Sequence, residues 1–281
     1  MYCAQVVQGE GFTIFLRKPV DDQIYLTVQT GGIPQRLDHL VTSIYQSIDD
    51  ILQDAKACVV HERIFGSNTC QHSILESRNR SLSKCCGDTG SGLFTFIEGK
   101  PVWGEGLAGI QVLAVSPRTS TEKVQVIYEK GAAVGRIWRR HGNTFVMLQN
   151  LHGQLSNSPA EDSRTAEVGR MFERTERLLK QVHGDYRDVV RTWLYLSEIL
   201  KWYPQFNEVR NSAYARFGIM PSTTDHEPVH RLTLPASTGI QAENPLGAAC
   251  LMDVLAIVGQ SRPPVVQMSN SRQKDAFRYR S

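Results

Sequence analysis

The sequence lacks the features that mark membrane, secreted and strongly charged proteins. No stretch approaches the ~18 consecutive apolar residues of a membrane-spanning helix, and the N-terminus MYCAQVVQGEGF lacks the basic region and apolar run of a secretory signal. The six cysteines include no C-x-x-C pair, which disfavours a zinc or redox motif and favours reduced thiols in a cytoplasm. With 31 basic against 28 acidic side chains, the net charge of +3 gives no strong attraction to nucleic acid or to a membrane surface. These absences predict a cytoplasmic protein without a membrane partner and leave small ligands open.

What is present is a repeated order of elements. At 281 residues, of which 41% are hydrophobic, the chain is long enough for two domains. Each half reads strand, helix, strand, helix, strand, strand. The strand QIYLTVQTGG leads into an amphipathic helix in the first half, and TFVMLQNLHG leads into another in the second, which ends at Gly184 as a helix C-terminus should. We predict an α+β protein of two tandem domains over residues 1–129, including part of a connecting hairpin, and 130–260, followed by a basic extended tail over 261–281.

One strand of the second half has a polar and aromatic side. In DVVRTWLYL, residues 188–196, strand alternation places Val189, Arg191, Trp193 and Tyr195 on one side and Thr192 with aliphatic residues on the other. The second side suits packing against the helices of its own domain. The first side must then face an interface with another unit, and Arg191 could pair there with a carboxylate, because a buried anion needs a cation or amide donors.

These segments resemble the RidA (YjgF, endoribonuclease L-PSP-like) superfamily. DVVRTWLYL, FNEVRNSAYARFG, LPASTGIQ and MDVLAI resemble that family's strand, helix and paired final strands over roughly residues 144–258, and the first half resembles a divergent second copy. The phrases VVRTWLYL (189–196), LPASTGI (234–240) and SRQKDAFRYR (271–280) are similar to those of chorismatases, the enzymes that cleave chorismate. The resemblance implies that each domain is a curved mixed β-sheet backed by two helices. It also implies a homotrimer, or a pseudo-trimer whose third unit lies outside this chain, with ligand sites in clefts between units.

The resemblance further implies a small carboxylated metabolite as the ligand. Arg191 and Arg231 would bind its carboxylate, and Tyr195 and Thr238 would donate hydrogen bonds. Asn211, which matches the family's helix asparagine, would orient the ligand. No cofactor and no metal is implied.

The position that distinguishes imine deaminases within the family is changed in this sequence. Those members bind the substrate carboxylate with an arginine just before the small residues of the penultimate strand, where this sequence has Ser237. Imine deamination is therefore disfavoured, and the first hypothesis is a chorismatase-like lyase or hydrolase. The alternative is a non-catalytic RidA-like binding or assembly module. Asp253, near the end of the last strand, is the candidate for the family's acidic residue, although alignment places Leu255 there.

Three further motifs match functional signatures in residue order but lack the structural context that the function needs. HEPVH (226–230) has a proline where a zinc-binding helix would run, and GDTGSG (87–92) lacks the lysine and helix start of a phosphate loop. GRIWRRHGN (135–143) gathers arginines around a tryptophan, but no second basic stripe accompanies it. We interpret it as the solvated face of a linker and expect no nucleic-acid partner.

Overall fold

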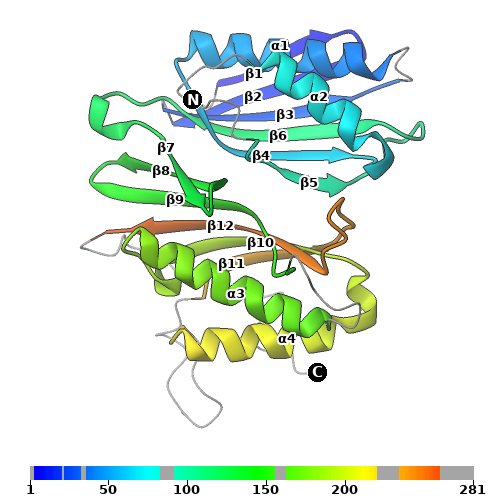
Figure 1. The fold of residues 1–281 in the computed structure, drawn as a ribbon. Helices are drawn as coiled ribbons and strands as arrows, with labels where there is room; N and C mark the ends of the chain where they lie inside the picture. The colour runs from blue at the N-terminus through cyan, green and yellow to red at the C-terminus, as the bar shows by residue number, and fades with distance from the viewer. Residues whose placement is uncertain are drawn as a thin grey trace, which may run out of the picture.

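The computed structural model describes residues 3–20, 22–32, 36–82, 92–155, 163–219 and 234–259. They form two six-stranded mixed sheets that lie against each other, with a pair of helices on the outer side of each (Figure 1). The predicted α+β class and the duplication are both confirmed. HEPVH, Arg231, residues 87–91 of GDTGSG and the tail over 261–281 lie outside the described residues. No helix in the described ranges is both long and apolar enough to cross a membrane.

The two domains repeat one topology strand for strand. The first sheet has the order β1-β2-β3-β6-β4-β5, and the second, taken from its other edge, has the order β7-β8-β9-β12-β10-β11. Among the described strands, only the pairs β4–β5 and β10–β11 are parallel. The elements of the first domain are β1 (Cys3–Gly9), β2 (Phe12–Val20), β3 (Gln23–Thr30), α1 (Leu37–Asp54), β4 (Cys58–Gly66), α2 (Gln71–Ser81), β5 (Thr95–Glu98) and β6 (Leu107–Val115). Those of the second are β7 (Gln125–Glu129), β8 (Ala132–Arg140), β9 (Asn143–Leu151), α3 (Arg164–Gln181), β10 (Val189–Leu196), α4 (Ile199–Arg216), β11 (Ala236–Gln241) and β12 (Cys250–Val258).

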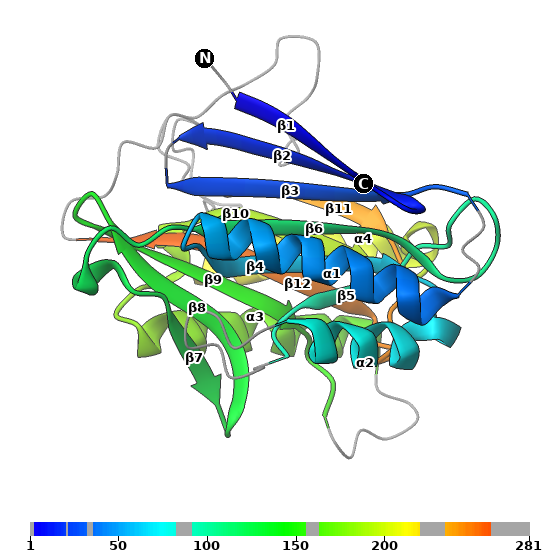
Figure 2. The ribbon, with the colours of Figure 1, turned by 90° about the horizontal axis from the view of Figure 1, so that it is seen from above.

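Each domain buries a core between its sheet and its helices. On α1, Val41, Ile44 and Ile48 recur at helical spacing and are almost fully buried in a cluster with residues of the first sheet. Figure 2 shows α1 lying over the strands of this sheet. The helix α3 begins at an N-cap, Ser163, whose hydroxyl accepts a hydrogen bond from the Ala166 amide. Its apolar side packs in the matching cluster of the second domain.

The helix α4 tolerates an internal proline because it is broken just before it. Trp202 has φ −150°, outside the helical range, so Pro204 stands near the start of the regular helix that continues to Arg216. A proline in the first turn of a helix removes no intrahelical hydrogen bond.

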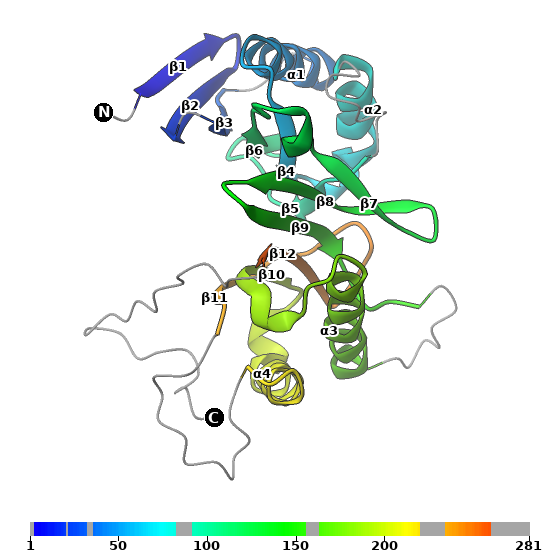
Figure 3. The same ribbon diagram turned by 90° about the vertical axis from the view of Figure 1, so that its left-hand side faces the viewer.

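The inner sides of the two sheets form the interface between the domains. Val60 and Val115 of the first domain are buried with Trp138 and Met147 of the second. The strands β4 and β5 lie against β9, whereas β1–β3 diverge from β10 and β11 (Figure 3). The chain passes from the first sheet to the second between β6 and β7, so the boundary expected near residue 130 falls within the β7–β8 hairpin of the second sheet.

The segment GRIWRRHGN is not a solvated linker face, and that prediction is wrong. It belongs to β8 and the turn after it, and Arg136 and Trp138 are 2% and 4% exposed. Arg136 donates hydrogen bonds to the Leu93 carbonyl of the first domain and to Gln149. Arg136 is buried here because one of its partners, the Leu93 carbonyl, comes from the first domain, 43 positions earlier in the chain, which a local pattern does not reveal.

Candidate functional site

The predicted site residues Arg191 and Thr238 lie together on adjacent strands. Arg191 Nη2 donates to Thr238 Oγ1 at 2.5 Å, and Thr238 on β11 is paired in register with Trp193 on β10. Tyr195 follows two positions later on the same side of β10, where it is 3% exposed and packs against Ile97 of the first domain. This side of β10 therefore faces the first domain, as the strand alternation predicts.

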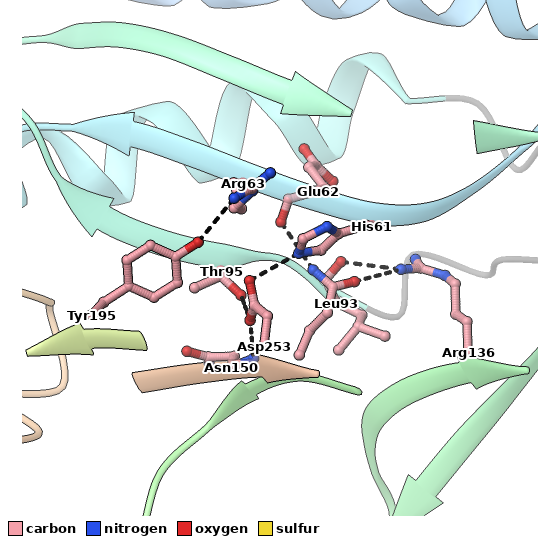
Figure 4. A network of polar contacts seen from close by, with 10 residues as sticks. His61, Glu62, Arg63, Leu93, Thr95, Arg136, Asn150, Tyr195 and Asp253 are labelled. Carbon is pink, nitrogen blue, oxygen red and sulfur yellow. Dashed lines mark hydrogen bonds and ion pairs between the residues drawn. The ribbon is translucent and has the colours of Figure 1, made fainter. Parts of the chain in front are cut away.

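The first domain adds an arginine that sequence reasoning missed. Arg63 on β4 donates through Nη1 to the Tyr195 hydroxyl at 3.2 Å, an interaction drawn in Figure 4. Its guanidinium carbon lies 5.2 Å from the centroid of the Trp193 ring, and that of Arg191 lies 5.4 Å from it. One indole thus holds a guanidinium group from each domain, in the range of cation–π contacts. The sequence contains a pattern that points to Arg63. CVVHERIFG repeats the Val-Val start of DVVRTWLYL, and this alignment places Arg63 on the side of its strand that corresponds to the Trp193 side of β10.

These two arginines have no acidic partner among the residues that the structure describes. In the described ranges no carboxylate oxygen lies within salt-bridge distance of Arg63 or Arg191, whereas other interface arginines such as Arg140 pair with a carboxylate, that of Asp22. Burial lowers the pKa of Arg191, and the positive charge of Arg63 lowers it further. The Arg63 Nε atom is buried without a described hydrogen-bond partner. Two neighbouring cations with unused donors make a site suited to an oxyanion.

A buried polar network lies beside the arginines and connects the two domains. Asp253 on β12 accepts a hydrogen bond from Thr95 Oγ1 at 2.5 Å and one from the Asn150 amide at 3.0 Å, and its other oxygen lies 2.8 Å from His61 Nε2 (Figure 4). His61 and Asp253 are 4% and 0% exposed. Burial lowers the pKa of His61 below its usual value, although Asp253 opposes the shift. A neutral His61 that donates to Asp253 satisfies this arrangement, which ties β4 and β5 to β12.

The structure does not bring the other predicted residues into this group as ligand-binding side chains. Asn211 lies on α4, on the helix side of the second sheet, where it accepts a hydrogen bond from Arg210. Arg231 is outside the described residues. Asp253, the acidic candidate, is completely buried and fully engaged in the network, so it is not presented to a ligand. No group of three or more potential metal-binding side chains gathers within the described part of the chain.

Comparison with known proteins identifies the fold. No protein-family model and no curated protein matches the sequence. Among solved structures, a crystal structure of chorismatase matches with a TM-score of 0.61 at 12% sequence identity, over 91% of this chain and 79% of that chain. The chain has the tandem RidA-like fold. Each domain of this tandem RidA-like chain is the mixed sheet with two helices described above, as the resemblance implied.

Single-domain proteins match about half of the tandem RidA-like chain. Yeast Mmf1 matches at 17% identity over 48% of this chain and 98% of its own, with a TM-score of 0.36. The E. coli YjgF gene product matches at 13% identity over 42% of this chain and 84% of its own, with a TM-score of 0.33.

Proposed function

We propose that the tandem RidA-like chain binds the carboxylate of a small metabolite between Arg63 and Arg191, at the seam of its two domains. The observation that carries this proposal is the pair of guanidinium groups on Trp193, one from each domain, with no described carboxylate beside them. Tyr195 and Thr238 supply hydroxyl groups next to these cations. A carboxylate placed there would offset the repulsion between these like charges and accept charge-assisted hydrogen bonds.

The fold match supports a catalytic version of this proposal, a chorismatase-like lyase or hydrolase. Such a reaction needs a group that donates a proton to the leaving oxygen. The Tyr195 hydroxyl is the proton-bearing group beside both arginines, and burial raises its pKa well above the usual value, so it stays protonated at neutral pH. Arg231, which lies three residues before LPASTGI, is proposed as a further residue that binds the carboxylate.

Titration with chorismate, pyruvate and 2-oxobutyrate tests the proposal. We expect saturable binding that weakens by about tenfold to a hundredfold in Arg63→Gln and Arg191→Gln, since each loses a charge-assisted hydrogen bond. Arg139→Gln, a change at an exposed arginine of β8, is the control and leaves affinity unchanged. Turnover of chorismate would support the enzyme, and saturable binding without turnover would support a binding module. Equal affinity in all four proteins would show that the arginine pair is not the site.

The assembly alternative is favoured by a sheet surface that the second domain leaves uncovered. In the second domain, Arg136 and Met147 are paired neighbours and are covered by the first domain, with Met147 0% exposed. Their counterparts by strand order are Arg17 and Tyr25, which are also paired neighbours, but Arg17 is exposed and Tyr25 is 43% exposed. Phe15 and Val6, paired with each other, extend the same surface. A third RidA-like unit would cover it as the first domain covers β8 and β9.

Solution mass tests this assembly. Light scattering coupled to size-exclusion chromatography is expected to show a species larger than one 31.5 kDa chain, and Tyr25→Glu is expected to reduce it to the single chain. Tyr128→Glu changes a tyrosine that is 54% exposed on the edge strand β7 and serves as the matched control. A single-chain mass for the unaltered protein across the micromolar range would rule out self-assembly through this surface.

A further inference from the structure

The first domain contains a buried ion pair whose counterpart in the second domain is incomplete. Arg78 on α2 donates to both oxygens of Glu62 on β4, at 2.9 and 2.5 Å, and Tyr45 donates to the same carboxylate at 2.7 Å. Arg78 and Glu62 are 4% and 1% exposed. The carboxylate therefore neutralises an arginine that is enclosed between helices and sheet.

The matching arginine of the second domain is Arg210. Both arginines occur in similar helix segments, ESRN over 76–79 and EVRN over 208–211, and in both the guanidinium group donates to the asparagine that follows, at 3.0 Å for Asn79 and 3.4 Å for Asn211. The duplicated topology makes α4 the counterpart of α2.

The matching strand position holds a threonine in place of the glutamate. Glu62 pairs with Val112 of the central strand β6, and Thr192 pairs with Val254 of the corresponding strand β12. Both side chains point to the helix side of their sheet, since Glu62 reaches Arg78 and Thr192 is fully buried beneath α4. The second domain thus has the arginine without the carboxylate that the first domain provides.

Arg210 is enclosed, and no carboxylate of the described residues forms an ion pair with it. It is 8% exposed, and its hydrogen bond to Asn211 is its one polar contact to a described residue. Its guanidinium group lies 5.9 Å from the centroid of the Phe206 ring, which contributes no negative charge. An enclosed cation without a counter-ion is costly for a folded protein, so the site has a strong preference for an anion.

Two further polar groups lie at this position. The Tyr214 hydroxyl is buried close to the Thr192 side chain, and burial raises the pKa of Tyr214 to about 12, so the hydroxyl keeps its proton and can donate it in a hydrogen bond. Thr192 Oγ1 donates to Ser237 Oγ at 2.9 Å, and Ser237 is exposed on the edge strand β11. The polar cluster therefore runs from Arg210 to the protein surface at β11.

We propose a second anion site between α4 and β10–β11, in which a small carboxylate takes the place of the Glu62 carboxylate. Arg210 supplies the charge, Tyr214 donates its hydroxyl hydrogen, and Thr192 is the shorter side chain at the position that Glu62 occupies in the first domain. The ligand is a carboxylate because a carboxylate fills the corresponding position in the first domain and one guanidinium group balances one negative charge. This site lies on the opposite side of the second sheet from Arg191 and does not depend on the proposed interdomain site.

Acetate is the probe, and binding at the interdomain site is first weakened with Arg191→Gln. Calorimetric titration of this variant is expected to show saturable binding of one acetate per chain, at a constant ionic strength set with sodium chloride. Adding Thr192→Glu supplies an internal carboxylate as in the first domain, so acetate affinity is expected to fall by about tenfold or more. Gln125→Glu, which adds the same charge at an exposed position of β7, is the matched control and retains binding.

Two further variants keep the test decisive if Thr192→Glu does not fold. Arg210→Gln and Tyr214→Phe, each combined with Arg191→Gln, are expected to weaken acetate binding, and circular dichroism checks that they are folded. Acetate affinity that is unchanged in folded Thr192→Glu, or in both of the other variants, would overturn the site. Inorganic phosphate is titrated in the same way. If it binds more tightly than acetate and Thr192→Glu abolishes that binding, the choice of a carboxylate as the ligand is overturned.

Discussion

Trp193 contacts charged or aromatic groups from both domains. The guanidinium groups of Arg63 and Arg191 lie over its ring, and the ring of His61 lies 5.1 Å from it, centroid to centroid. The indole is therefore the surface that holds two like charges near each other while leaving their donors available. Removing it should loosen both arginines without removing either charge.

The variant Trp193→Leu tests this positioning role. Cation–π contacts are worth about 0.5–2 kcal/mol each, so loss of both should weaken binding of a carboxylated ligand by about tenfold. Trp193→Phe retains an aromatic face and should lose less. Calorimetric titration measures the ligand affinity of each variant, because replacing a tryptophan changes the fluorescence of the protein by itself. Equal affinities for the leucine and phenylalanine variants would show that the ring does not position the arginines.

At the scale of elements, the strands show what a sequence can and cannot reveal. The side of β10 that carries Arg191, Trp193 and Tyr195 could be predicted, because alternation is a local property of any strand. The exception is Val189, which joins the core of its own domain because the register of β10 shifts between Val189 and Arg191. A bulge of this kind depends on the neighbouring strand and so leaves no clear local signal.

The parts of the site that come from pairing between sheets were not predictable from one sequence. Arg63 reaches Tyr195 across 132 positions of the chain, and His61 reaches Asp253 across 192. Such contacts depend on how two complete domains pack. The internal repeat was the available guide, because it shows which strands of the first domain correspond to β10 and β11.

The turn between β9 and α3 requires a glycine. A Cβ atom on Gly153 would lie 1.8 Å from the Glu167 carbonyl oxygen, which is backbone and cannot move aside. Gly31 follows β3, the counterpart of β9, and a Cβ atom there would meet nothing within 4 Å. We expect Gly153→Ala to lower the free energy of unfolding by more than about 2 kcal/mol and Gly31→Ala to change it by less than about 0.5 kcal/mol. Urea denaturation measures both values, and similar losses for the two variants would contradict this account.

At the scale of the whole molecule, Asp253 is the main polar connection between the domains. Asparagine at this position cannot accept from His61, Thr95 and the Asn150 amide in the same way, because one of its two side-chain acceptors becomes a donor. We expect Asp253→Asn to destabilise the protein by more than about 2 kcal/mol, since it leaves buried donors unsatisfied. Asp50→Asn, at an exposed position of α1, is the control. A loss no larger than that of the control, measured by urea denaturation, would show that this network contributes little.

The interface also predicts a pH dependence. Because the pKa of His61 is lowered in the folded protein, the unfolded chain binds a proton more readily than the folded chain does. The stability associated with a neutral His61 is therefore present above a pH of about 6.5 and is lost as the pH falls below it. The pKa of His152 is lowered by burial as well, so both residues contribute. We expect His61→Gln to reduce, and not abolish, the fall in thermal unfolding temperature between pH 7.5 and 5.5, and an unchanged slope would contradict the assignment.

The position of Arg63 and Arg191 on different domains links ligand affinity to domain association. A ligand held by both arginines can be bound fully only while the seam is closed, so at a hundred times its dissociation constant it would oppose opening by about 2.7 kcal/mol. The linkage is reciprocal. Any change that favours opening of the seam should lower the affinity for the ligand in proportion to the fraction of open molecules. Loss of the Arg140–Asp22 ion pair, at the end of β8, is one such change. The concentration of the metabolite would then set the fraction of molecules in which the two domains are separated.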